Sequence, residues 1–242
     1  MSNLFKIILI GFICTSCSLL PSPTPLSIQA DIQTAEWSKK WWMPRHEEKL
    51  AKKKEIGNVG LVFLGDSITH AWDNKGKAEW QEYYSKHNAL NIGFSGDRTE
   101  NVLWRIDHGA VDDIDPKLLV LMIGTNNTGH RQDKPADTAL GIKTILSNLE
   151  DKLPNTKVLL LAIFPRGATK ADPLRKINDD INNIIKNFDN GDSVHYLDIN
   201  HIFLDASGDL SKTVMNDLLH PNRNQYKRWA EVMDPKISAL MK

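Results

Sequence analysis

A serine, an aspartate and a histidine stand at positions that suit nucleophilic attack on a carbonyl group. Ser67 lies in the run Gly65-Asp66-Ser67-Ile68-Thr69, directly after the apolar stretch Val59–Leu64, and Asp217 and His220 lie near the far end of the chain. A serine hydroxyl attacks efficiently when an imidazole takes its proton and a carboxylate orients that imidazole. Since Asp217 is three residues before His220, both side chains are able to face one cleft. These residues predict a serine esterase.

Two further blocks contain hydrogen-bond donors for the tetrahedral intermediate of such a reaction. They are Gly93-Phe94-Ser95-Gly96-Asp97 and Gly124-Thr125-Asn126-Asn127. The oxyanion needs fixed donors, which a glycine loop and an amide side chain supply, and each donor is typically worth about 3 kcal/mol in the transition state. This chemistry requires no metal and no cofactor, and the histidines other than His220 show no metal-ligand spacing.

Alternating strands and helices must position these blocks. Short apolar, β-branched runs predict buried strands, and longer stretches with a 3.6-residue period predict helices between them. This alternation over one domain predicts an α/β fold, a three-layer α/β/α sandwich with a mainly parallel sheet of roughly five strands. The predicted strands are Gly60–Leu64, Leu90–Phe94, Leu118–Ile123, Val158–Phe164 and Val194–Ile199, and the predicted helices are Thr99–Ile106, Ala136–Leu153, Pro173–Phe188 and Asn222–Leu240.

The four blocks whose residues could take part in catalysis converge on one edge of this sheet. The serine, glycine and amide blocks end the first, second and third predicted strands, and the aspartate-histidine block precedes the last helix. In an open parallel sheet, ligands bind outside the carboxyl ends of the strands. One such block alone is weak evidence for a site, but the convergence of four blocks predicts an active site at this edge.

Taken together, the blocks resemble those of the SGNH or GDSL hydrolase superfamily, whose fold is flavodoxin-like. Within it, the chain is similar over roughly residues 55–240 to the platelet-activating-factor acetylhydrolase-like branch and related bacterial acetylesterases. The resemblance rests on the four blocks, Ile92–Arg105 and Pro165-Arg166-Gly167. Ile68 replaces the leucine of the GDSL name, and Asn127 stands where many members have aspartate, although the acetylhydrolase branch also has asparagine there.

The resemblance implies a role for each site residue. Ser67 is the expected nucleophile, His220 the general base and acid, and Asp217 the residue that orients His220. The expected oxyanion donors are the backbone N–H groups of Ser67 and Gly96 and the side chain of Asn126. Ser95 is a rival nucleophile, but its block lacks the final glycine of a Gly-x-Ser-x-Gly elbow.

Several aromatic and basic residues are candidates for substrate contact. Trp72 and Arg98 directly follow the serine and glycine blocks, so we expect them to contact substrate. The tryptophans at 37, 41 and 42 either form a sugar-stacking platform or pack an N-terminal helix onto the domain. Packing is favoured, because aromatic residues at helical spacing are usually core residues.

The N-terminus predicts export and a membrane anchor. Residues 1–17 contain Lys6, an apolar stretch too short to span a bilayer, and Cys17 after two small residues, which resembles a bacterial lipoprotein signal. We therefore expect a signal peptide over 1–17, lipidation of Cys17, a Pro/Ser-rich tether over 18–35 and the hydrolase domain over 36–242. The expected location is the periplasm or cell surface; an ordinary signal cleaved elsewhere and an uncleaved anchor are the alternatives.

Charge and loop composition bear on the substrate. The chain has 30 basic and 30 acidic residues, which argues against a nucleic-acid partner. The segments that follow the first three blocks are mostly polar, which predicts a short acyl group such as acetyl, released from carbohydrate. A short-chain phospholipid or lysophospholipid acylhydrolase is the alternative enzyme, and a binding lipoprotein on an esterase fold is the alternative of another class.

Overall fold

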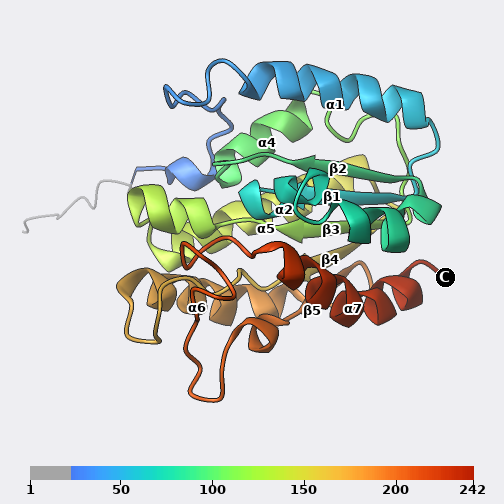
Figure 1. The fold of residues 1–242 in the computed structure, drawn as a ribbon. Coiled ribbons are helices and arrows are strands. Elements are labelled where there is room, and N and C mark those ends of the chain that lie inside the picture. The colour runs from blue at the N-terminus through green and yellow to red at the C-terminus, as the bar shows by residue number, and fades with distance from the viewer. Residues whose placement is uncertain (1–22) are drawn as a thin grey trace, which may run out of the picture.

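A five-stranded parallel sheet forms the centre of the molecule (Figure 1). The computed structural model describes residues 23–242. Neighbouring strands follow the order β2-β1-β3-β4-β5, and every pairing is parallel, which confirms the predicted flavodoxin-like α/β/α sandwich. The strands are β1 (Leu61–Gly65), β2 (Ala89–Gly93), β3 (Leu118–Met122), β4 (Lys157–Leu161) and β5 (Val194–Leu197).

Helices cover both faces of the sheet. The long ones are α1 (Trp42–Ile56), α4 (Thr99–Asp107), α5 (Pro135–Lys152), α6 (Pro173–Ile185) and α7 (Arg223–Leu240). Residues of α1, α4, α5 and α6 pack on one face, while α7 and short segments after β1 and β5 pack on the other. The short helical segments after β1 are α2 (Ser67–His70), η2 (Ala71–Asp73), α3 (Lys77–Glu79), η3 (Trp80–Tyr84) and η4 (Ser85–His87), and those elsewhere are η1 (Leu26–Ile28), η5 (Asn127–Arg131), η6 (Lys186–Phe188) and η7 (Asn200–Phe203).

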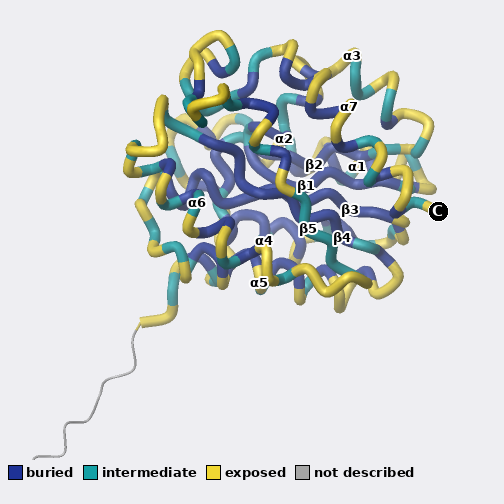
Figure 2. The backbone as a smooth tube through the Cα atoms, turned by 90° about the horizontal axis from the view of Figure 1, so that it is seen from below, coloured by how far each residue is buried: buried dark blue, intermediate teal, exposed yellow. Residues whose placement is uncertain are grey.

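The central strands β1 and β3 are buried along their whole length, as their continuous apolar sequences predict, whereas the edge strand β5 is half-buried (Figure 2). Successive side chains of β1 alternate between the two layers: Leu61 and Phe63 belong to the core beneath α7, and Val62 and Leu64 to the core beneath α4 and α5. The strand order reverses at β1, since the chain passes from β1 to β2 on one side and returns to β3 on the other. The predicted site lies at this switch point.

The N-terminal segment differs from the prediction. Residues 26–35 were expected within the Pro/Ser-rich tether, but Ser27 is 1% exposed and Gln33 5% exposed. The Ser27 hydroxyl donates to the Asp137 carbonyl at 2.5 Å, and Thr99 Oγ1 donates to the Ser27 carbonyl at 2.8 Å. The tether prediction is therefore wrong for 26–35, because side chains of α4 bind the backbone of this segment and the Ser27 side chain binds the backbone of α5.

The predicted signal peptide, Cys17 and residues 18–22 of the predicted tether lie outside the described residues. From residue 23 to the C-terminus, the structure contains no helix that is both long and apolar enough to cross a membrane.

Candidate active site

Ser67 occupies the first position of the short helix α2, immediately after β1. The buried Asp66 precedes it, and its side-chain oxygen Oδ1 accepts a hydrogen bond from the Ile68 backbone N–H at 2.9 Å. This side-chain cap fixes the turn from strand to helix. Ser67 is thereby held at the carboxyl end of β1, with part of its surface exposed.

His220 and Asp217 approach Ser67 from the segment before α7. Ser67 Oγ lies 2.8 Å from His220 Nε2, and His220 Nδ1 lies 2.6 Å from Asp217 Oδ2. Desolvation raises the pKa of Asp217, but hydrogen bonds from the backbone and side chain of His220 outweigh it and lower the pKa to about 2. Asp217 is therefore a carboxylate at neutral pH, as a residue that orients an imidazole must be.

The turn from Asp217 to His220 is held in an unusual backbone conformation. Leu218 has φ of +58°, in the left-handed region that leucine rarely adopts. Asp217 Oδ1 accepts from the backbone N–H groups of Leu219 at 3.0 Å and His220 at 2.8 Å, and the Leu218 carbonyl accepts from Gly167 N–H at 2.9 Å. Such strain persists where surrounding bonds fix it, and it occurs often at active sites.

The block Pro165-Arg166-Gly167 links this turn to the amide block. Gly167 binds the Leu218 carbonyl, and Arg166 Nη1 donates to the Thr125 carbonyl at 2.8 Å. Thr125 directly precedes Asn126. The position of Asn126 relative to the histidine turn is therefore set by one short segment after β4.

Gly96 and Asn126 lie together in the predicted oxyanion region. Asn126 Nδ2 donates one hydrogen bond to the Asp97 carbonyl, at 2.9 Å, and a side-chain amide has two N–H donors. Gly96 has φ of +77°, which favours glycine, and its carbonyl accepts from Gln33 Nε2 at 3.0 Å. The structure thus places the amide of Asn126 against the loop that contains Gly96.

A buried ion pair that the sequence did not predict anchors the loop after β2. Arg105 Nε lies 2.8 Å from Asp97 Oδ2, and Trp42 Nε1 donates to Asp97 Oδ1 at 2.6 Å. Desolvation raises the pKa of Asp97 to about 6, against the opposing effect of Arg105. The only sequence feature that could have indicated this pair is the position of Arg105 among the apolar residues of the predicted helix Thr99–Ile106, eight residues after Asp97. Trp42 of α1 and Arg105 of α4 therefore both hold this loop in place through Asp97.

Two predicted substrate contacts need correction. Trp72 is 0% exposed and packs against Tyr226 and Trp229, with ring centroids 4.8 Å apart in each pair, so it belongs to the core and cannot contact substrate. Arg98 Nε lies 2.5 Å from Glu100 Oε1. Because Glu100 also pairs with Arg131, we assign Arg98 to an ion network beside the N-terminal segment instead of the substrate site.

The rival nucleophile Ser95 also contacts a histidine. Its hydroxyl lies 3.0 Å and its backbone nitrogen 3.3 Å from His70 Nδ1. Burial, with Arg45 as a further cause, lowers the pKa of His70 to about 4, so its ring is neutral at neutral pH. Since the Ser95 backbone N–H donates to Nδ1, this nitrogen is an acceptor. The pair therefore holds the loop before Gly96.

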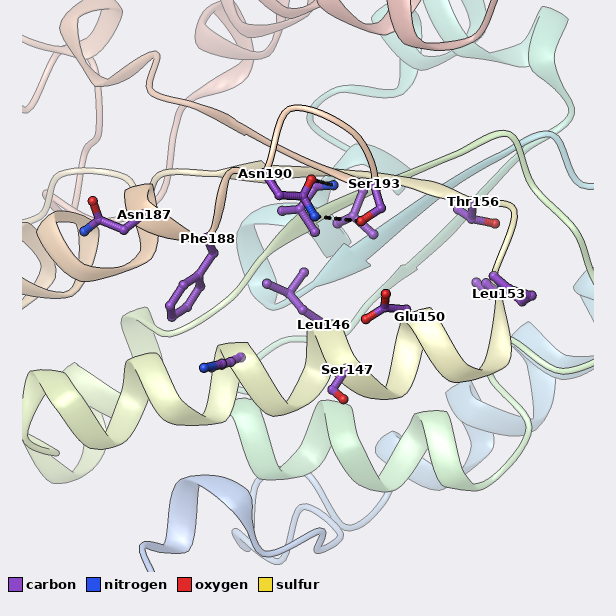
Figure 3. A pocket seen from close by; sticks show the side chains of 13 residues that line it. Leu146, Ser147, Glu150, Leu153, Thr156, Asn187, Phe188, Asn190 and Ser193 are labelled. Atoms are coloured by element: carbon purple, nitrogen blue, oxygen red, sulfur yellow. Dashed lines mark hydrogen bonds between the residues drawn. The ribbon is translucent and has the colours of Figure 1, made fainter.

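A pocket of about 380 Å³ lies elsewhere on the molecule (Figure 3). Leu146 and Phe188 line it together with Asn190 and Ser193, whose side chains are hydrogen-bonded at 2.9 Å. The pocket also includes residues at the amino ends of β4 and β5, whereas Ser67 follows the carboxyl end of β1. It therefore lies at the sheet edge opposite the triad. Within residues 23–242, no group of three or more histidine, cysteine, aspartate or glutamate side chains could hold a metal ion.

The fold and the sequence define a class of known proteins. Residues 63–228 match the model of the GDSL-like lipase/acylhydrolase family, and the chain belongs to this family. It is accordingly an ester hydrolase of the GDSL type, as its blocks predicted. Among curated proteins it is similar to the platelet-activating factor acetylhydrolase IB subunit alpha1 of Homo sapiens, with 34% identity over 187 residues, which cover 76% of this chain and 78% of the human protein.

Two solved structures share the fold at low sequence identity. A GDSL-like lipase from Bacteroides thetaiotaomicron superposes with a TM-score of 0.66 and 16% identity, over 81% of this chain and 97% of that one. An acetylxylan esterase from Geobacillus stearothermophilus superposes with a TM-score of 0.59 and 16% identity, over 74% of this chain and 94% of that one. These likenesses confirm the predicted architecture.

The cap residue Asp66 leads to a prediction about pH. Desolvation raises the pKa of the buried Asp66 to about 7, far above its ordinary value near 3.9. Between about pH 4 and 7 the unfolded chain therefore loses a proton that the folded protein keeps, so this group lowers stability as pH rises. In Asp66→Asn the amide oxygen still accepts from the Ile68 N–H, but the side chain does not titrate, so this decrease of stability with rising pH is absent. We expect the stability of Asp66→Asn relative to wild type to increase from pH 4 to pH 8, by at most about 4 kcal/mol.

Urea unfolding of both proteins at several pH values measures this difference. Titrating groups that do not interact with Asp66 are present in both proteins and cancel in the comparison, whereas the repulsion between Asp66 and Asp97 is part of the measured difference. A difference that is flat or falls between pH 4 and 8 would show that the folded state does not raise the pKa of Asp66.

Proposed function

We propose that the protein is a serine esterase that removes short acyl groups, chiefly acetyl, from hydroxyl groups of carbohydrates. The observation that carries the proposal is the continuous hydrogen-bonded array from Ser67 Oγ through His220 to Asp217, with distances of 2.8 Å and 2.6 Å. This array occurs in a chain of an ester hydrolase family. A nucleophile, a base and an orienting carboxylate in this order are the components of acyl transfer through a covalent intermediate.

The first half of the reaction forms an acyl-enzyme. Ser67 Oγ attacks the ester carbonyl carbon while His220 Nε2 takes the hydroxyl proton, and the carbonyl oxygen becomes an oxyanion. The backbone N–H groups of Ser67 and Gly96 and the amide of Asn126 stabilise this oxyanion. His220 then donates the proton to the leaving alkoxide oxygen, the carbon–oxygen bond breaks and the alcohol departs.

The second half restores the enzyme. A water molecule attacks the acyl carbon while His220 Nε2 takes one of its protons, which generates a second oxyanion at the same donors. Collapse of this intermediate breaks the bond to Ser67, His220 returns the proton to Oγ, and the carboxylic acid departs. Asp217 keeps its negative charge throughout and stabilises the imidazolium that forms twice.

The preference for a short acyl group leads to a second prediction. The loops around Ser67 are rich in polar and charged residues, and the large apolar side chains that follow it, Ile68 and Trp72, are buried in the core. A longer chain gains about 0.8 kcal/mol for each methylene that it buries, but only where an apolar groove exists. We expect kcat/KM for aryl esters to fall from acetyl to butyryl and to be at least about tenfold lower for octanoyl, a difference of ~1.4 kcal/mol.

Initial rates with 4-nitrophenyl esters of two to eight carbons measure this preference. A specificity constant that rises with chain length would overturn the acetylesterase proposal. It would favour the second candidate, a short-chain phospholipid or lysophospholipid acylhydrolase, for which the similarity to the human platelet-activating factor acetylhydrolase subunit is the supporting observation. A binding lipoprotein without activity is a third outcome, in which no ester is hydrolysed.

The N-terminus supports a proposal about location. We propose that Cys17 is lipidated and anchors the enzyme on the membrane after export. Each buried methylene of an acyl chain adds about 0.8 kcal/mol of membrane affinity, and several chains make the attachment stable. We expect wild type to fractionate with membranes and Cys17→Ala to lack the acyl mass. An acyl-free mature N-terminus downstream of Cys17 would contradict the proposal.

A further inference from the structure

Two of the three N-terminal tryptophans form an exposed aromatic surface, which we call the shelf and define as Trp37 and Trp41. Their ring centroids are 6.0 Å apart with an interplanar angle of 27°. Trp37 is 52% exposed, whereas Trp42 is 1% exposed and belongs to the core. The predicted packing is therefore confirmed for Trp42 and wrong for Trp37. A large apolar ring left in solvent needs another explanation than core packing.

The shelf lies against the predicted oxyanion loop. A Cβ atom on Gly96 would lie 2.1 Å from Cη2 and 2.7 Å from Cζ2 of Trp37, so the six-membered edge of the indole touches this glycine. Gly96 is also the residue whose backbone N–H we propose as an oxyanion donor. A group attached to an ester bound at this donor therefore lies within reach of the Trp37 ring face.

Hydrogen bonds hold the shelf in place before any ligand arrives. Trp41 Nε1 donates to the Trp37 carbonyl at 3.1 Å. Four residues before Trp37, the buried Gln33 donates through Nε2 to the Gly96 carbonyl at 3.0 Å and accepts from Ala35 N–H at 3.2 Å. A binding surface that is already ordered loses little conformational entropy when it binds a ligand.

The surroundings of the shelf suit a sugar ring better than an acyl chain. Beside Trp41 lies an open hollow lined by Lys40, Trp41, Pro44, Arg45, Glu48 and His70. A pyranose ring has an apolar face of C–H groups that packs flat on an indole, and hydroxyl groups at its rim that bind charged and polar side chains. An acyl chain instead needs a continuous apolar groove, and Lys40, Arg45 and Glu48 interrupt the apolar surface here.

We infer that the shelf is a carbohydrate subsite, which binds a pyranose ring of an O-acetylated glycan while its ester lies at Ser67. This inference rests on the proposed function and specifies its substrate class. In it, Trp37 supplies the stacking face next to the oxyanion loop, and Trp41 supports Trp37 and extends the surface toward His70. The ring centroids of Trp41 and His70 are 5.9 Å apart.

The test compares two substrates that differ only in what the shelf could bind. Acetate release is measured with an O-acetylated xylo-oligosaccharide and with ethyl acetate, whose alcohol part is too small to stack. For Trp37→Ala we expect kcat/KM to fall at least about tenfold more on the oligosaccharide than on ethyl acetate, with most of the difference in KM. Trp37→Phe keeps an aromatic face and should recover most of this loss.

Trp37→Leu separates stacking from packing. Leucine fills space against Gly96 but has no aromatic face, so we expect it to behave like Trp37→Ala on the oligosaccharide. Leu140→Ala, a change of an exposed apolar residue on α5, serves as the control and should alter neither activity. Equal losses on both substrates, or recovery of activity in Trp37→Leu, would contradict the proposed subsite and show that Trp37 only packs against Gly96. If wild type hydrolyses ethyl acetate but no acetylated glycan, the proposed function fails, and the subsite fails with it.

Discussion

Ser67→Ala is expected to abolish ester hydrolysis, with kcat lower by at least about 10³-fold, because its hydroxyl is the atom that forms the acyl-enzyme. The fold should survive, since Ser67 is partly exposed and its side chain makes a single hydrogen bond, to His220. Rates with 4-nitrophenyl acetate measure the loss, and circular dichroism melting checks the fold.

Ser95→Ala is the matched variant for this experiment. Ser95 is also hydrogen-bonded to a histidine, His70, but our account gives it a role only in holding the loop before Gly96. Its loss should therefore be at least about a hundredfold smaller than that of Ser67→Ala. Activity of folded Ser67→Ala within tenfold of wild type, combined with an inactive Ser95→Ala, would move the nucleophile to Ser95.

Asp217→Asn is expected to lower turnover by about three to four orders of magnitude. The side-chain oxygen of asparagine can keep the bonds to the backbone N–H groups of Leu219 and His220, which leaves its NH₂ group facing His220 Nδ1. A donor at that position requires Nδ1 to be an acceptor, so the proton resides on Nε2 and the ring cannot take the proton of Ser67. In serine proteases the same exchange costs about 10⁴-fold by the same wrong tautomer.

Steady-state rates of Asp217→Asn measure this loss. The exposed Asp192, which precedes β5, provides a control, and Asp192→Asn should retain wild-type turnover. A loss below tenfold for Asp217→Asn would mean that another acceptor orients His220.

The parts of the fold and site that the sequence predicted share one property: local pattern determines them. Continuous apolar runs predicted all five strands, and the parallel character of the sheet followed from their alternation with helices. Strand ends then placed Ser67, Gly96 and Asn126 at one edge without knowledge of tertiary contacts. The structure places Ser67, His220 and Asp217 in one hydrogen-bonded array and the Asn126 amide against the loop that contains Gly96.

The features that the sequence did not predict depend on the directions of side chains and on contacts between distant segments. Trp72 follows the helix of Ser67, but the turn η2 directs its ring into the core beneath α7. Arg98 and Glu100 lie two residues apart, and their pairing depends on where α4 begins. The segment 26–35 has the composition of a tether, yet Thr99 and Asn101 bind its backbone. Such contacts arise between distant residues, so no local pattern reports them.

Labelling with a fluorophosphonate probe tests the central claim most directly, because the probe forms a covalent bond with an activated serine. Peptide mass mapping of the labelled wild-type protein locates the adduct. We predict one adduct, on Ser67, which is absent from Ser67→Ala and strongly reduced in Asp217→Asn. Labelling of Ser95 instead, or no labelling of the folded wild-type protein, would contradict the account of this chain as a serine esterase that acts through Ser67.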